Sequence, residues 1–112
     1  MTATDVSKLT HRELDALITD KVMGWTVAPH EPEEIHQRFL VAGKRVFAPF
    51  YSTDRNAAAL VVEKLVDLGL HLRLATAIWE MCPGSKSAVW FALTITPHQL
   101  MEACLLAWEQ SQ

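Results

Sequence analysis

Two threonine-led motifs fix where helices begin in this chain. Thr10 is followed by Glu13, and Thr96 is followed by Gln99, with Pro97 directly after the second threonine. In each motif the threonine oxygen can accept a hydrogen bond from one unpaired amide of the first turn, while the glutamate or glutamine reaches back to another. Proline suits the first helical position because it has no amide to leave unpaired. We therefore expect a helix near each end of the chain.

Apolar residues repeat at helical spacing after each of these starts. After the first, Leu14, Leu17, Ile18 and Val22 follow, and Gly24 can adopt the left-handed conformation that ends a helix. The expected first helix covers residues 11–23. After the second start, an apolar face predicts a closing helix; it consists of Leu100, Met101, Cys104, Leu105 and Trp108.

A third helix start lies in the middle of the chain, within the sequence FAPFYSTDRN at 47–56. Ser52 or Thr53 can cap this helix, and Asp54 is well placed against the positive end of the helix dipole. Gly69 ends the helix, whose expected buried stripe consists of Ala58, Val61, Val62, Leu65 and Leu68.

Two later stretches show a different pattern, in which apolar residues alternate with other residues. This period of two covers 70–79 and 88–95, and Pro83-Gly84 lies between them. Alternation of this kind predicts half-buried strands, so the pair is expected to form a long antiparallel hairpin.

Trp79 and Trp90 fall on the face of this hairpin that carries mainly small and polar residues. That face is expected to be covered by a helix or by another subunit. Since a two-stranded hairpin has unpaired edges and is rarely stable alone, we expect a homo-oligomer, a dimer or larger.

Residues 25–49 carry weaker signals. The sequence RFLVAGKRVF has two short apolar pieces around Ala42-Gly43-Lys44, which is typical of a small hairpin, with a loop as the alternative. The predicted fold class is α+β, with three helices packed on a small antiparallel sheet. Its order is helix, short hairpin or loop, helix, strand, strand, helix, and residues 1–112 form one domain.

Composition limits the classes of function. With 112 residues, 50% of them hydrophobic and 21% charged, the chain is expected to form a small globular protein. A net charge of -3 argues against a nucleic-acid-binding protein, which needs cations to neutralise phosphates. No apolar run is long enough for a membrane span or a signal peptide, so we expect no membrane association and a cytoplasmic location. Two cysteines in that compartment are expected to stay reduced.

The sequence shows no motif for a reaction or a cofactor. VAGKR at 41–45 lacks the leading glycine and the hydroxyl residue after lysine that a phosphate-binding loop requires. Neither cysteine has a neighbouring cation and base. A metal cluster of His30, Glu34 and His36 is conceivable, but a solvated acidic loop is the favoured interpretation. We therefore expect a protein that is not an enzyme, without catalytic residues, cofactor or bound metal.

The strongest candidate for a binding site is the junction at 50–56. The amides of a helix N-terminus, two hydroxyl groups and the nearby Arg55 and Asn56 are groups that hold a phosphate or a ribose. The same residues also make a common helix cap, and on local sequence alone capping is the favoured interpretation. The candidate ligand-binding residues are Tyr51, Ser52, Thr53, Asp54, Arg55 and Asn56, with contributions from Arg45 and Arg73.

Three blocks of sequence together resemble a known family. They are RELDALITDKVMGW at 12–25, YSTDRNAAALVVEKL at 51–65 and WFALTITPHQLMEACLLAW at 90–108. In this combination they are similar to the small phage and prophage proteins grouped as the phage ABA sandwich domain family. Residues 26–48 depart from the family's pattern, as does Arg55, where the family more often has an aliphatic residue.

The resemblance implies an origin and a type of activity. It suggests a phage or prophage accessory protein, related to proteins that sequester cyclic ADP-ribose immune signals of the Thoeris defence system without turning them over. The expected function is therefore non-enzymatic anti-defence by binding a nucleotide-derived signal. The alternative is an inhibitor that binds a host defence or metabolic protein directly, with the acidic EPEE segment at 31–34 as a contact. An enzyme acting on nucleotides is the least favoured reading.

Overall fold

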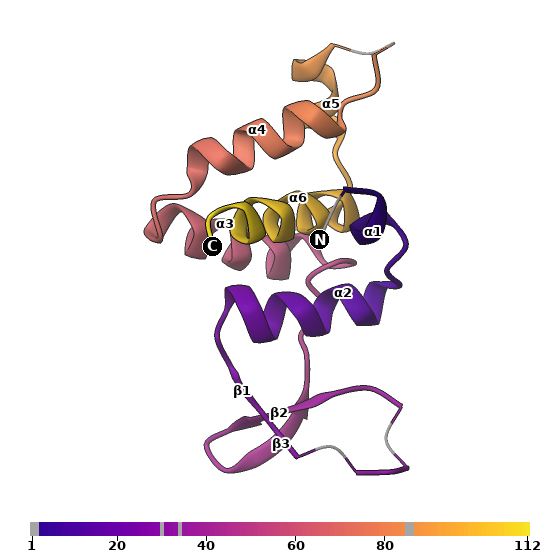
Figure 1. Ribbon diagram of the computed structural model, residues 1–112, viewed down its shortest axis with the longest axis vertical. Coiled ribbons are helices and arrows are strands. Elements are labelled where there is room, and N and C mark those ends of the chain that lie inside the picture. Colours follow the sequence, from indigo (N-terminus) through magenta and orange to yellow (C-terminus); the bar gives the residue numbers. More distant parts are fainter. Residues whose placement is uncertain (1–2, 30, 34, 85–86) are drawn as a thin grey trace.

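The computed structural model describes residues 3–29, 31–33, 35–84 and 87–112, and it has a mixed α+β fold. No described helix combines the length and apolar character needed to cross a membrane. The elements follow one another as shown in Figure 1: helices α1 (Ala3–Ser7) and α2 (His11–Leu17), the π-helical turn η1 (Ile18–Val22), strands β1 (Thr26–Val27), β2 (Arg38–Val41) and β3 (Lys44–Phe47), and helices α3 (Arg55–Asp67), α4 (His71–Met81), α5 (Ala88–Thr94) and α6 (Pro97–Gln110).

Both predicted capping boxes are confirmed. The Thr10 hydroxyl accepts from the backbone N–H of Glu13 at 3.2 Å, and the Glu13 carboxylate accepts from the N–H of Thr10 at 3.2 Å. Thr96 and Gln99 make the same pair of hydrogen bonds at 3.1 and 3.0 Å. These contacts satisfy amides that the first helical turn leaves unpaired, and they start α2 and α6 where the sequence predicts.

The start of α3 differs in detail from the prediction. Asp54, and neither Ser52 nor Thr53, is the cap, since its carboxylate accepts from the backbone N–H of Asn56 at 2.9 Å. The end of this helix is as predicted, because Gly69 has a φ of +75°. Only a residue that tolerates this left-handed conformation can end the helix at that point without strain.

Helix α6 is the centre of the hydrophobic core. It packs against α1, α2, η1, α3 and α4, and Figure 1 shows it between α4 and α2. Six of its residues are buried, including Cys104 at 0% exposure. The other elements supply the remaining fully buried apolar side chains of this core, among them Val6, Leu14, Ile18, Ala58, Val61 and Leu65.

The sheet is small and lies at one end of the molecule. Its strands run antiparallel in the order β1-β2-β3, with Phe39 opposite Val46. Ala42 and Gly43 form the turn with φ values of 51° and 79°, which confirms the predicted hairpin in this region. Helix α2 separates the sheet from the other helices in Figure 1, so the helices do not form a layer over it as expected.

The long hairpin predicted over 70–95 is wrong, because these residues form α4 and α5. In α4 the buried side chains are Leu74 and Ala77, three residues apart, whereas Leu72 is 73% exposed. Leucine and alanine are strong helix formers, and the same positions that alternate also make a helical stripe against α6. Helix α5 begins with a Ser87 cap that the alternation concealed, and it buries Phe91. The predicted element order is corrected accordingly.

The exposure of two leucines provides a test of this correction. A strand would place Leu72 and Leu74 on the same face, but in α4 Leu74 is buried and Leu72 is exposed. We expect Leu74→Ala to lower the free energy of unfolding by about 2–4 kcal/mol, because it leaves a cavity against α6. Leu72→Ala serves as the matched control and should change it by less than about 0.5 kcal/mol in dilute solution. Urea denaturation measures both, and equal losses would contradict the helix.

Candidate functional site

A buried carboxylate ties α2 to the segment that enters α3. One oxygen of the fully buried Asp15 accepts from the backbone N–H of Ser52 at 2.8 Å, and the other accepts from Arg12 at 3.0 Å. A second guanidinium nitrogen of Arg12 donates to the Ala48 carbonyl at 2.8 Å, and the guanidinium lies 4.4 Å from the centre of the Phe50 ring. These contacts hold residues 48–52 against α2 and fix the orientation of the Arg12 side chain.

Two of the predicted site residues are part of this packing. Tyr51 and Ser52 are each 2% exposed, and the Ser52 hydroxyl donates to the His11 carbonyl at 3.1 Å. Burial, and then the nearby charge of Asp15, raise the pKa of Tyr51 above its ordinary value. Both side chains therefore lie under α2, where they join two parts of the chain and are closed to solvent.

The four following residues lie at the exposed start of α3. Thr53, Asp54, Arg55 and Asn56 are all exposed to solvent. The Asp54 carboxylate is occupied as the helix cap, and Arg55 donates to the Ile95 carbonyl at 3.0 Å. Arg55 thus links the start of α3 to the end of α5. The junction does start α3, with Asp54 as the cap in place of the predicted Ser52 or Thr53, and a ligand contact here stays a prediction.

The structure does not bring Arg45 and Arg73 together at this junction. Arg45 on β3 donates to the Pro29 carbonyl at 2.8 Å and lies 3.9 Å from the Glu31 carboxylate. Arg73 on α4 donates to the Gln110 carbonyl at 3.2 Å. Their elements lie toward opposite ends of the long axis in Figure 1, so one small ligand cannot contact both arginines.

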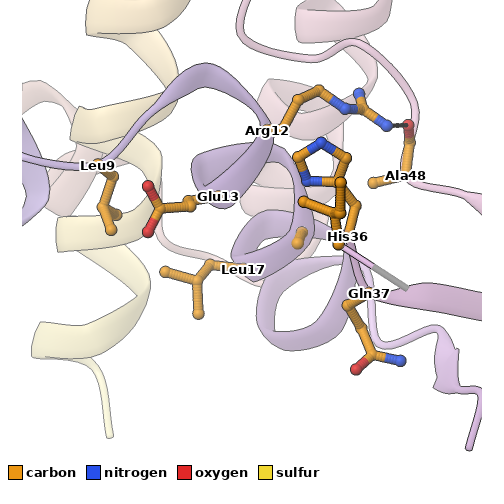
Figure 2. A pocket seen from close by; sticks show the side chains of 9 residues that line it. Leu9, Arg12, Glu13, Leu17, His36, Gln37 and Ala48 are labelled. Atoms are coloured by element: carbon orange, nitrogen blue, oxygen red, sulfur yellow. Dashed lines mark hydrogen bonds between the residues drawn. The ribbon is translucent and has the colours of Figure 1, made fainter. Parts of the chain in front are cut away.

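A pocket of about 320 Å³ opens on the other side of the same network, between α2 and residues 35–37. Figure 2 shows Arg12 reaching to Ala48 on one side of this pocket, with Leu9 and Glu13 on the other. We call it the α2 pocket, and its lining consists of Leu9, Arg12, Glu13, Ala16, Leu17, Ile35, His36, Gln37 and Ala48.

Sequence reasoning did not identify the α2 pocket. Its helical wall could have been found, because Arg12 and Ala16 are four residues apart on one face of α2. The opposite wall gives no such signal. Ile35 and His36 belong to the segment between β1 and β2, and only the tertiary fold brings this segment against α2.

The polar groups of the α2 pocket have distinct binding capacities. Arg12 makes two described hydrogen bonds, which leaves further N–H donors on its guanidinium for an anionic oxygen. Hydrogen bonding by the side chain and then the backbone of Thr10 holds the pKa of Glu13 below its ordinary value. Glu13 is therefore an ionised acceptor at neutral pH, suited to hydroxyl groups. Leu9, Ala16 and Leu17 add an apolar wall.

Metal and thiol chemistry find little support in the described part of the chain. There, no three His, Cys, Asp or Glu side chains are placed to hold a metal ion. His30 and Glu34, which the sequence offered as partners of His36, lie outside the described residues. Cys82 and Cys104 are both reduced, and burial raises the pKa of Cys104 to about 12. Cys104 is thus a core residue, and its thiol is protonated at neutral pH.

Comparisons with family models, with curated proteins and with solved structures found no match to this chain. The resemblance to the phage ABA sandwich domain family therefore stays a prediction.

Removal of the buried carboxylate should destabilise the protein. Asp15→Ala leaves the buried N–H of Ser52 without its acceptor and Arg12 without its counter-charge. We expect a loss of about 2–4 kcal/mol in the free energy of unfolding, measured by urea denaturation. Asp67→Ala, at an exposed position on α3, is the control and should stay within about 0.5 kcal/mol of the wild type. Equal stability of the two variants would show that the network contributes little.

The two cysteines should differ in reactivity. We expect a thiol reagent to modify only the partly exposed Cys82 in the native protein, and both cysteines after denaturation. Cys82→Ser should leave a native protein that does not react, because Cys104 is fully buried and its pKa is near 12. Rapid native labelling of that variant would contradict the core position of Cys104.

Proposed function

We propose that this protein is a non-enzymatic binding protein that sequesters a small nucleotide-derived ligand in the α2 pocket. The observation that carries the proposal is the guanidinium of Arg12, which is held in one orientation at the edge of a concave site. A preoriented cation binds a phosphate with little loss of side-chain freedom. The buried Asp15 and the Ala48 carbonyl supply that orientation.

The chemistry of the pocket matches the parts of a nucleotide. Arg12 suits a phosphate, and the ionised Glu13 suits the hydroxyl groups of a ribose. The apolar wall of Leu9, Ala16 and Leu17 suits one face of a base. A volume of about 320 Å³ is at the lower end of the range for small-molecule sites, roughly 300–1,000 Å³, which favours a compact ligand such as a cyclic one.

Binding without turnover fits the state of the titratable groups. Glu13 is held ionised and cannot donate a proton at neutral pH. The thiol of Cys104 is sealed in the core. Together with the resemblance to phage ABA sandwich proteins, these properties support a phage or prophage accessory protein. It would act against host defence by withdrawing a cyclic ADP-ribose-type signal, for which binding alone is sufficient.

The predicted junction residues have an indirect part in this proposal. The backbone N–H of Ser52 holds Asp15, which in turn holds Arg12. The junction therefore orients the Arg12 side chain indirectly, through Asp15. Direct ligand contacts by Tyr51 or Ser52 would need α2 to move away, since both residues are 2% exposed.

The alternative function is inhibition of a host protein by direct contact. It is favoured by a group of exposed apolar side chains on α4 and α5, two helices that Figure 1 shows on the opposite side of α6 from α2. The acidic segment predicted as its contact includes Glu34, which lies outside the described residues. A host-protein inhibitor would bind no nucleotide, so the ligand experiment separates the two functions.

Calorimetric titration with ADP-ribose and cyclic ADP-ribose tests the proposal. We expect binding of the cyclic compound and, at a ligand concentration of about 100 times Kd, roughly 2.7 kcal/mol of added stability. Ala16→Leu should weaken binding at least about tenfold, because the longer side chain fills the pocket while remaining a good helix former. Ala59→Leu, on the exposed side of α3, is the matched control.

Two results would count against the proposal. If neither nucleotide binds the wild-type protein, a small-molecule role for the α2 pocket is ruled out for this ligand class. If both bind but Ala16→Leu has no effect while it remains folded, the ligand site lies elsewhere on the molecule.

A further inference from the structure

The outer faces of α4 and α5 carry five large apolar side chains that are mostly exposed. We call them the α4–α5 surface: Leu72 is 73% exposed, Trp79 69%, Val89 71%, Trp90 58% and Leu93 75%. An apolar depression of about 330 Å³ lies between the two helices, and Trp79 and Val89 line it together with Ala75, Ile78, Ala88 and Ala92. Helix α5 contains no charged residue at all. A surface of this composition is expected to be covered by another polypeptide.

The size of the α4–α5 surface is close to that of a dimer contact. Five large side chains at these exposures present on the order of 600 Å² of apolar area, which is at the upper end for a patch on a monomer. A stable interface buries about 800 Å² on each partner. Covering the α4–α5 surface and its immediate surroundings would therefore be enough for a specific complex.

The arrangement of charges on α4 indicates which polypeptide covers the α4–α5 surface. Arg73 and Glu80 are seven residues apart, about two turns, and both are exposed. They follow Leu72 and Trp79 directly in the sequence, so they flank the apolar stripe on the same side. One end of the stripe is thus positive and the other end negative. Two copies of α4 that run antiparallel would therefore place opposite charges next to each other at both ends of the stripe.

We propose that the α4–α5 surface binds a second copy of this chain, with the two α4 helices antiparallel across a two-fold axis. Leu72 of each chain packs against the partner's Trp79, and Arg73 of each chain faces the partner's Glu80. The axis passes near Ala75 and Thr76, whose small side chains allow the helices to approach closely. A parallel pair would instead bring Arg73 to the same level as the partner's Arg73 and Glu80 to the same level as the partner's Glu80, so no opposite charges would meet.

This dimer explains why α5 can carry so many exposed apolar residues. Val89, Trp90 and Leu93 extend the surface beside α4, and the second copy would remove them from water. The α2 pocket is lined by residues of α2, and Figure 1 shows α2 on the opposite side of α6 from α4 and α5, so dimer formation leaves the pocket open. Self-association and ligand binding are therefore independent properties that can be tested separately.

Sedimentation equilibrium over a concentration series tests the proposal. We expect the wild-type protein to be a dimer that dissociates on dilution, and Trp79→Glu to weaken the dimer at least about 100-fold. Leu60→Glu is the matched control, since Leu60 is 53% exposed on α3 and should leave the dimer intact. Circular dichroism of each variant in dilute solution verifies the fold. A wild-type monomer at every concentration overturns the proposal and assigns the surface to a different protein.

A charge exchange tests the antiparallel geometry itself. Arg73→Glu and Glu80→Arg should each weaken the dimer by about tenfold, because each change places like charges opposite each other twice. The double variant R73E/E80R should restore most of the wild-type affinity, since the charges again match their reversed partners. If the surface bound a different protein, exchanging the two charges in this chain alone would not restore the affinity. Additive losses in the double variant would overturn the two-fold arrangement.

Discussion

The buried carboxylate of Asp15 is the interaction on which the arrangement of the chain depends. It joins residues that are 37 positions apart, because one oxygen accepts from Ser52 and the other accepts from Arg12. A buried charge is tolerated only when its hydrogen-bonding capacity is met, and here a backbone N–H and a guanidinium meet it. As a result α2 is fastened to the segment that connects β3 with α3, and the sheet is held at one end of the helices.

The same interaction determines what the surface near α2 can do. Arg12 can be oriented at the edge of a pocket only because Asp15 and Ala48 hold its guanidinium. At the other end of the molecule, α4 and α5 have no comparable polar network among the described contacts, and their outer faces are apolar. The molecule thus has a pocket with an oriented cation beside α2 and an apolar surface on α4 and α5, which suit a small ligand and a second polypeptide respectively.

Short-range features were the part of the fold that could be predicted. The boxes at Thr10 and Thr96, the stop at Gly69 and the turn at Gly43 all depend on contacts within about four residues. The prediction failed over 70–95, where leucines and alanines satisfy both an alternating and a helical pattern. Packing against α6 decided between them, because the helix buries Leu74 and Ala77 together.

The sequence by itself determined where α2, α3 and α6 begin and where the small hairpin lies, since caps and left-handed glycines act locally. It also indicated the candidate residues at 50–56, but it could not show which of them cap the helix and which make buried contacts. Tertiary structure made that division: Asp54 caps α3, whereas Ser52 turns inward to a carboxylate on a distant helix. The physical reason is that a buried polar group needs a hydrogen-bond partner, and this partner can be distant in the sequence. A local sequence pattern contains no information about which distant residue it will be.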